Sequence, residues 1–340
     1  DVPTDCPQRD ERLGWTGDAQ VFIGTASFNM DVAAFFTKWL KDVVAEQSET
    51  GAYPFYAPYI TKDPVIGAAA WGDAGIICPW TLYLNYGDTR ILTDHYESMT
   101  GWIRYIQGVA GEGLIWRDGF QYGDWLATDR PDLGTPFGLT DKDLIGTAFF
   151  AYSVQLMAKI AAVLGKTDDT RIYEDLAERV AQAFCAEFVT PNGRVGANTQ
   201  TAYVLALMFD LLPESQREPA VRRLVADIEA RDMHFATGFV GTAYIAHVLK
   251  RFGYLETAYD LLLQDTCPSW LYAVTQGATT IWERWDGQRP DGSFQTPDMN
   301  SFNHYAYGAI GEWLYKIVAG LQLDPQRPAY KHIIIHPQPG

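Results

Sequence analysis

Pairs of helix-period segments separated by short turns run along most of this 340-residue chain. Within a segment, apolar residues recur three and four positions apart, as in Ile172, Leu176 and Val180, which is the pattern of an amphipathic helix. Repeated helical hairpins of this kind predict an all-α fold, either closed into a ring or stacked as a solenoid. The predicted helices are 18–29, 31–47, 73–86, 88–109, 144–164, 169–189, 199–212, 214–231, 241–252, 255–264 and 304–321. A ring of six hairpins needs a twelfth helix, which is expected in 267–275 or upstream of residue 1.

Three long connections, 48–72, 112–142 and 277–303, interrupt the helical pattern and are rich in aromatic residues. Long connections in a folded domain are usually functional, so we expect them to gather at the binding end of the fold. The alternative is that their rings only pack the connections onto the helices. The rings concerned are Tyr53, Phe55, Tyr56, Trp71, Trp116, Trp125, Trp282 and Trp285.

Composition excludes several classes of function. The net charge of −16 repels phosphate backbones and anionic lipid surfaces, so neither nucleic acid nor a membrane is an expected partner. The four cysteines are widely scattered, with neither metal-ligand spacing nor a disulfide framework. Metal-binding, nucleotide-binding and nucleophile-elbow motifs are absent from the sequence, and we therefore predict no metal and no cofactor. Acid–base chemistry by carboxylates is what remains.

The segment DCPQRDERLGWTGD, residues 5–18, concentrates charge where no regular element can form. It carries four carboxylates, two arginines and a tryptophan among a proline and two glycines. The arginines can hold some of the acids ionised while a less well paired acid keeps its proton. Environments that separate two carboxyl pKa values in this way assign acid and base roles, so we interpret the segment as half of a catalytic site.

The second concentration is GATTIWERWDG, residues 277–287, in which Glu283 lies between Trp282 and Trp285. Indole rings stack against the C–H face of a sugar while carboxylates bind its hydroxyls, so this arrangement favours a carbohydrate site. The alternative for Glu283 is an ion pair with Arg284 or with another arginine.

Other polar residues have a structural alternative beside the functional one. Asp73, in Trp-Gly-Asp, either binds substrate or caps the following helix. In Gly-Asp-Trp, residues 123–125, neither Asp124 nor Trp125 caps an obvious helix. His304 either contacts a ligand or makes structural hydrogen bonds.

The motifs together resemble the catalytic domain of bacterial α-L-rhamnosidases, glycoside hydrolase family 78. The matching stretches follow family order from residue 5 to about residue 320. They are DCPQRDERLGWTGDAQ, WGDAGIICPW, YGDWL, TGFVGTAYI, GATTIWERWDG and SFNHYAYGAIGEWLY. The first and the last stretches are specific, whereas WGD alone would be weak.

The resemblance implies an (α/α)6 barrel over residues 1–325, with 326–340 as the start of a linker or strand into a C-terminal β-domain. It implies an inverting hydrolase acting on terminal non-reducing α-L-rhamnosyl residues, with a rhamnose-containing glycoside and the flanking β-domains as partners. Alternatives are another inverting (α/α)6 exo-glycosidase, fucosidase- or trehalase-like, and a carbohydrate-binding relative that has lost catalysis. The aglycone and the location, bacterial cytoplasm or secreted, stay open.

By the same resemblance Glu11 corresponds to the general acid and Glu283 to the general base. An inverting pair lies roughly 6.5–9.5 Å apart to admit a water molecule. A ring that joins its two ends would bring these two residues face to face. The expected substrate-binding residues are Asp5, Arg9, Asp10, Trp15, Asp18, Trp71, Asp73, Trp125, Trp282, Trp285 and His304.

Overall fold

Helices make up most of the computed structural model, which describes residues 1–8, 12–61, 64–130 and 135–340. The α-helices are α1 (Thr16–Asn29), α2 (Ala33–Ala45), α3 (Ala74–Tyr86), α4 (Arg90–Ala110), α5 (Lys142–Val163), α6 (Thr167–Phe188), α7 (Gln200–Met208), α8 (Glu214–Ala230), α9 (Phe239–Arg251), α10 (Leu255–Leu263), α11 (Trp270–Thr275) and α12 (Ile310–Trp313). Three short helical turns, η1 (Pro297–Met299), η2 (Ala306–Ala309) and η3 (Leu314–Val318), and two strands, β1 (Leu321–Leu323) and β2 (Ile333–Ile335), complete the elements.

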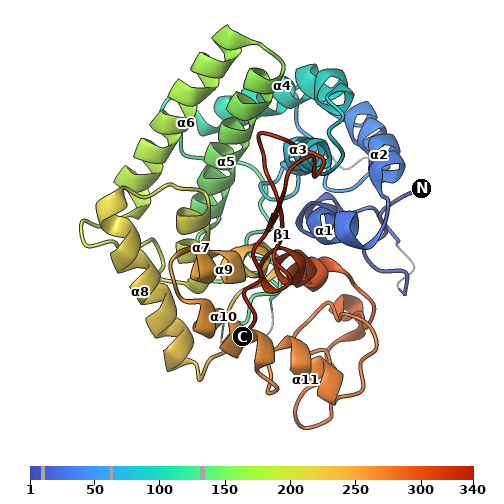
Figure 1. The fold of residues 1–340 in the computed structure, drawn as a ribbon, viewed down its shortest axis with the longest axis vertical. Coiled ribbons are helices and arrows are strands. Elements are labelled where there is room, and N and C mark those ends of the chain that lie inside the picture. The colour runs from blue at the N-terminus through green and yellow to red at the C-terminus, as the bar shows by residue number, and fades with distance from the viewer. Residues whose placement is uncertain (9–11, 62–63, 131–134) are drawn as a thin grey trace.

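Alternate helices form a closed inner ring. Contacts run from α1 to α3, α5, α7 and α9, then to η2, and from η2 back to α1 (Figure 1). The ring closes by bringing the C-terminal part of the chain against the N-terminal helix. A solenoid would leave those two ends apart, so the closure decides between the two predicted arrangements in favour of the barrel.

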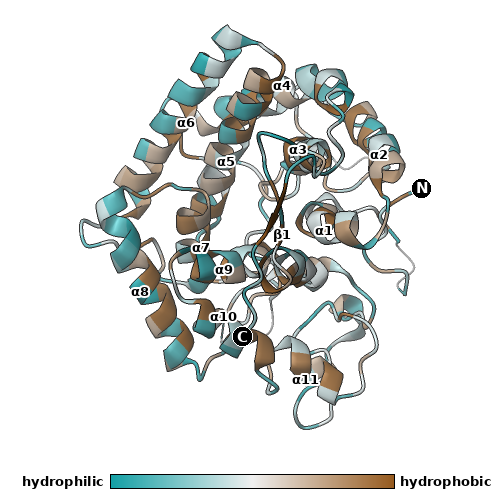
Figure 2. Ribbon diagram, viewed as in Figure 1, coloured by the Kyte–Doolittle hydropathy of each residue, from teal (hydrophilic) through white to brown (hydrophobic). Residues whose placement is uncertain are grey.

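The remaining helices form an outer layer and differ from the inner ones in their burial pattern. Eight of the nine residues of α7 are buried, because both faces of an inner helix meet protein. In α6 the buried residues recur every three or four positions from Tyr173 to Phe188. Figure 2 shows hydrophilic and hydrophobic residues interleaved along α6 and α8 in the outer layer. The three- and four-residue spacing of apolar residues in the sequence is therefore typical of the helices in the outer layer.

Helix α5 is long and apolar enough to span a membrane by length and composition, and 83% of its most apolar window is buried inside the protein. Its contacts with α3, α4, α6 and α7 account for that burial. The apolar character of α5 is therefore that of a central barrel helix.

The predicted helices agree with α1 to α10, and α11 falls within 267–275, where a twelfth helix was expected. The prediction of one continuous helix over 304–321 is wrong, since this stretch passes through 3-10, α and π turns in succession. Thr25 of α1 explains the break. Its hydroxyl donates to the carbonyls of Gly308 and Ala309 and accepts from the Glu312 amide, at 2.9–3.2 Å. A side chain inserted into a helical hydrogen-bond ladder changes its pitch.

The C-terminal segment folds back over the ring as a hairpin. Strand β1 pairs antiparallel with β2, and Figure 1 shows the pair crossing in front of the ring. Backbone hydrogen bonds join Gln338 to Ile317 and Ala329 to Leu84, at 3.0 and 2.8 Å. The predicted boundary at residue 325 thus falls between two paired strands. That 326–340 leads into a β-domain stays a prediction.

Candidate active site

A cavity of about 570 Å³ opens at the end of the ring where the long connections meet. It receives residues from the N-terminal segment, α1, all three long connections, α9 and the start of the last helical stretch. Its lining consists of Asp5, Gln8, Trp15, Asp18, Trp71, Tyr122, Trp125, Phe239, Glu283, Pro297, Asp298, Met299 and His304. The two acid-rich segments separated by most of the chain therefore meet in one cavity.

Three carboxylates surround the imidazole of His304 at the buried end of the cavity. Its Nε2 lies 3.2 Å from Asp18 Oδ1, 3.6 Å from Asp5 Oδ2 and 4.0 Å from Glu283 Oε1. All four residues are at most 3% exposed. His304 Nδ1 accepts a hydrogen bond from the Ala306 amide at 3.4 Å, which leaves Nε2–H to face the acids.

Burial and mutual charge shape the ionisation of this cluster. Burial, assisted by the charges of Asp5 and Glu283 and opposed by that of His304, raises the pKa of Asp18 to about 7. Burial alone would lower the pKa of His304, but the hydrogen bond to Asp5 and the negative charge of Asp18 and Glu283 outweigh it, so that its pKa is raised. The protonation of Asp18 is consequently coupled to that of His304.

Glu283 is held by the backbone of the connection that carries it. Its amide donates to the Ser301 carbonyl at 2.8 Å, and the His304 amide donates to the Ile281 carbonyl at 2.9 Å. The Ser301 hydroxyl also accepts from the thiol of Cys6 at 2.8 Å. These contacts fix the general-base candidate and His304 relative to each other and to the N-terminal segment.

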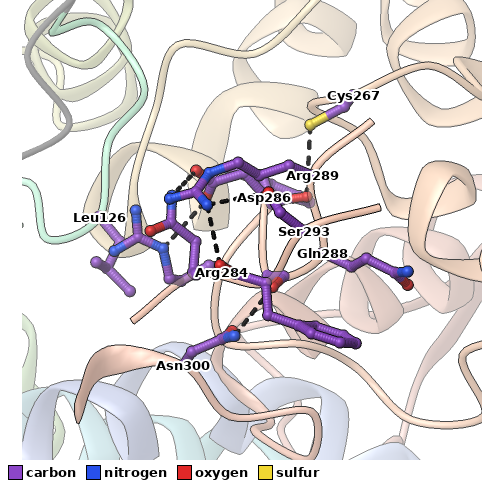
Figure 3. Close-up of polar contacts among 12 residues, drawn as sticks. Leu126, Cys267, Arg284, Asp286, Gln288, Arg289, Ser293 and Asn300 are labelled. Carbon is purple, nitrogen blue, oxygen red and sulfur yellow. Dashed lines mark hydrogen bonds and ion pairs between the residues drawn. The ribbon is translucent and has the colours of Figure 1, made fainter. Parts of the chain in front are cut away.

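The ion-pair alternative for Glu283 does not describe Arg284. The Arg284 guanidinium bonds Asp286 at 3.0 Å, and both side chains are largely buried. Figure 3 shows this pair within a wider set of contacts that stabilise the connection. Asn300 Nδ2 donates to the Gly287 carbonyl at 2.9 Å, and Arg289 donates to the Phe294 carbonyl at 2.9 Å. The arginine therefore stabilises the connection through a neighbouring acid.

Aromatic rings form the walls of the cavity around Tyr122. Its ring centroid lies 5.8 Å from Trp15, 4.4 Å from Trp71 and 5.5 Å from Trp125. The three tryptophans expected at the site are thus brought together, each from a different segment. Two lining residues, Tyr122 and Phe239, were not predicted as site residues. The ring centroid of Phe239 lies 5.3 Å from that of His304.

Asp124 connects the wall to α9. Its carboxylate accepts from the amides of Gly238, Val240 and Gly241 at 2.8–3.2 Å, and from the Thr201 hydroxyl. The Phe239 amide donates to the Trp125 carbonyl at 2.9 Å. A carboxylate at a helix N-terminus satisfies otherwise unpaired amides, so Asp124 caps a helix more than a hundred residues further along the chain and positions Trp125 and Phe239.

Three predicted binding residues lie outside the cavity lining. The carboxylate of Asp73 is buried and accepts from the Ala70 amide, the Trp102 indole and the Ser153 hydroxyl, at 2.6–3.0 Å. Trp285 is buried between Phe235 and Tyr307, with centroids 5.2 and 4.0 Å away. Trp282 packs against Phe302 at 4.9 Å. These three side chains stabilise the surrounding structure rather than facing the cavity.

Three further predicted residues, Arg9, Asp10 and Glu11, lie outside the described residues. Their expected contribution as substrate ligands and general acid stays a prediction. In the part of the chain that the structure describes, no group of three or more His, Cys, Asp or Glu side chains could hold a metal ion.

A ring of six helical hairpins with acids and aromatic rings gathered at one end defines the six-hairpin glycosidase class. The chain belongs to the family of bacterial alpha-L-rhamnosidase six-hairpin glycosidase domains, whose model matches residues 1–318. It is 48% identical over its full length to an alpha-L-rhamnosidase of Streptomyces avermitilis and 45% identical to one of Formosa agariphila. It spans 32% and 36% of the length of these two relatives.

Solved structures agree with this assignment. The structure of the Streptomyces avermitilis alpha-L-rhamnosidase complexed with L-rhamnose matches the whole chain with a TM-score of 0.92. The match covers 32% of the Streptomyces protein. The native alpha-L-rhamnosidase of Aspergillus terreus, 38% identical, matches with a TM-score of 0.95 over the whole chain and 39% of its own length.

Proposed function

We propose that this chain is the catalytic domain of an α-L-rhamnosidase that hydrolyses terminal α-L-rhamnosyl residues with inversion. The observation that carries the proposal is the enclosed group of Asp5, Asp18 and Glu283 around His304. It lies at the floor of a cavity walled by indole rings. The proposal that the sugar is rhamnose rests on the relatives named above. The structure complexed with L-rhamnose belongs to a protein that matches all of this chain.

Glu283 is assigned as the general base. Its carboxylate lines the cavity, its backbone amide is fixed by the Ser301 carbonyl, and His304 Nε2 lies 4.0 Å from its Oε1. In an inverting reaction this carboxylate takes a proton from the water that attacks the anomeric carbon. Glu11 is assigned as the acid that protonates the leaving oxygen on the opposite face of the sugar.

Asp5, Asp18 and His304 are assigned to the sugar hydroxyls. Carboxylates accept hydrogen bonds from hydroxyl groups, and His304 Nε2 lies within 3.6 Å of both aspartates and so fixes them at the floor of the cavity. Trp15, Trp71 and Trp125 offer flat apolar faces to the C–H groups and to the methyl of a 6-deoxy sugar. Pro297, Asp298 and Met299 complete the lining and are candidates for the aglycone side.

The test is hydrolysis of p-nitrophenyl α-L-rhamnopyranoside by the wild type, by Glu283→Gln and by Glu174→Gln, an exposed control on α6. We expect the Glu283 variant to lose at least about a thousandfold in kcat and the control to keep wild-type activity. If the wild type hydrolyses α-fucosides or glucosides but not the rhamnoside, the proposal that the substrate is a rhamnoside is wrong. Full activity of the Glu283 variant would remove its assignment as base.

A further inference from the structure

A second cavity lies inside the ring at the end covered by the C-terminal hairpin. It measures about 360 Å³ and is lined from α1, α3, α5, α7, α9, the last helical stretch and β1. This volume is at the lower end of the roughly 300–1,000 Å³ of small-molecule sites. Among the described residues, the two cavities share no lining side chain. Helix α1 lines both cavities, with Asp18 in the first and Gln20 in the second.

One wall of the second cavity is a rigid group of phenols. Tyr152 stacks parallel on Phe209 with centroids 4.2 Å apart, and Tyr244 packs edge-on against the same ring at 5.4 Å. Burial raises the pKa of both phenols, so their hydroxyls stay protonated over the whole working range of pH. Trp80, on α3, adds an indole ring to the lining.

Several polar groups facing this cavity lack a protein partner. Gln20 is 4% exposed, and its Nε2 donates to the Ala70 carbonyl at 3.0 Å, whereas its Oε1 has no hydrogen-bond partner among the described residues. Within the same residues, the hydroxyls of Tyr152 and Tyr244 and the ring of His247 form no hydrogen bond either. A buried polar group without a partner costs about 1–3 kcal/mol, so a donor held in the cavity would stabilise Gln20 Oε1. The two phenols and the imidazole are partly buried and offer further hydrogen-bonding groups to the same space.

The charged groups of the lining cancel. Lys316 hydrogen-bonds the Glu312 carboxylate one helical turn away, and no other Asp, Glu, Lys or Arg among the described residues lines the cavity. Gly24 admits that carboxylate, since a Cβ there would lie 2.4 Å from Glu312. Burial lowers the pKa of His247 to about 4, which keeps the imidazole neutral. The cavity therefore matches a ligand without net charge.

We propose that this cavity binds a neutral polyhydroxylated small molecule, a free monosaccharide or a polyol. Hydroxyl groups both donate and accept, as the mixture of Gln20 Oε1, two phenols and a neutral imidazole requires. The indole of Trp80 can contact the C–H face of such a molecule. The site is independent of the candidate active site and does not rest on the reaction proposed for it.

The test uses ¹⁹F NMR of the full chain labelled with 5-fluorotryptophan. The Trp80 signal is assigned by its loss in Trp80→Phe, and L-rhamnose, D-glucose and glycerol are the probes. We expect a saturable shift of this signal with at least one probe. Tyr244→Phe should raise the Kd by up to about tenfold, since it removes one hydrogen bond. Ala243→Leu, which fills the cavity, should abolish the shift.

Two controls separate the cavity from other effects. Tyr254→Phe, at the start of α10, and Glu283→Gln, in the candidate active site, should leave the Trp80 response unchanged. A shift that does not saturate, or that persists unchanged in Tyr244→Phe and Ala243→Leu, overturns the proposal. So does a response to acetate or ammonium with none to the three neutral probes. Tyr244→Phe removes a single oxygen atom, so it carries the test even if Ala243→Leu fails to fold.

Discussion

Replacement of Asp18 by asparagine should make the stability of the protein depend on pH in a defined direction. The Asp18 carboxyl is 3% exposed, and burial, assisted by Asp5 and Glu283, raises its pKa from 3.8 to about 7. A carboxyl with a higher pKa in the folded state binds its proton more tightly when folded. Its favourable contribution is therefore complete below about pH 4 and is lost as the pH rises through about 7.

The size of the effect follows from the shift. The difference of 7 − 3.8, or 3.2 pKa units, corresponds to about 4 kcal/mol at about 1.36 kcal/mol per unit. Asparagine carries no charge and escapes this loss. The variant also removes a carboxyl that raises the pKa of His304. In the wild type this raised pKa stabilises the folded state at low pH, and the stabilisation is lost as the pH rises through the folded-state pKa of His304. The free energy of unfolding of Asp18→Asn minus that of the wild type should thus increase by about 4 kcal/mol between pH 4 and pH 9.

Urea unfolding at pH 4, 6 and 9 measures this difference, with Asp260→Asn on the exposed side of α10 as the matched control. The control difference should stay constant with pH. Asp18→Asn should meanwhile lose activity at every pH, because a ligand for the sugar is changed. A difference that is flat or falls with pH would refute the argument that burial dominates the ionisation of Asp18.

Three further substitutions test other parts of the site. Glu11→Gln should lose most activity on rhamnosides with poor leaving groups, and an equal loss on p-nitrophenyl rhamnoside would contradict its assignment as acid. Asp124→Ala should lower the free energy of unfolding by about 2 kcal/mol or more, because four donors lose their acceptor, and should lower kcat/KM; unchanged thermal unfolding would contradict the capping role. Tyr122→Ala should lower kcat/KM roughly tenfold, mainly through KM, since three indoles lose their common neighbour; a loss in kcat alone would contradict a role in shaping the sugar walls.

The helical hairpins could be predicted from sequence because their information is local. An outer helix such as α6 carries its buried face in its own spacing from Tyr173 to Phe188. The stretch 304–321 could not be predicted in the same way. Its pitch depends on the hydroxyl of Thr25, which lies almost at the other end of the chain and meets it only when the ring closes.

Two similar motifs illustrate the same limit for the site. Asp73 and Asp124 both follow a glycine and lie within two positions of a tryptophan, and both are buried. Asp73 bonds Trp102 and Ser153, whereas Asp124 caps α9, and neither lines the cavity. Apart from the Ala70 amide, their partners lie 29 to 117 positions away, and residue type at the motif does not reveal them.

The residues around Glu283 show why sequence neighbours are poor guides to a cavity. Trp282 and Trp285 flank the acid in the chain, but their rings pack against Phe302 and Tyr307. Tyr122, whose ring contacts three wall tryptophans, stands two positions before Asp124 in YGDWL, and nothing in that motif distinguishes its ring from a packing residue. The acids themselves were recognisable because charge without a regular element needs a chemical reason.

The most direct test of the account is the anomeric configuration of the sugar first released from p-nitrophenyl α-L-rhamnopyranoside, followed by ¹H NMR before mutarotation. Inverting hydrolysis with Glu283 as base predicts β-L-rhamnose as the initial product, and Glu283→Gln should not form it at a comparable rate. Initial release of α-L-rhamnose would instead mean a covalent glycosyl-enzyme intermediate and would contradict the assignment of Glu283 as the base that activates water.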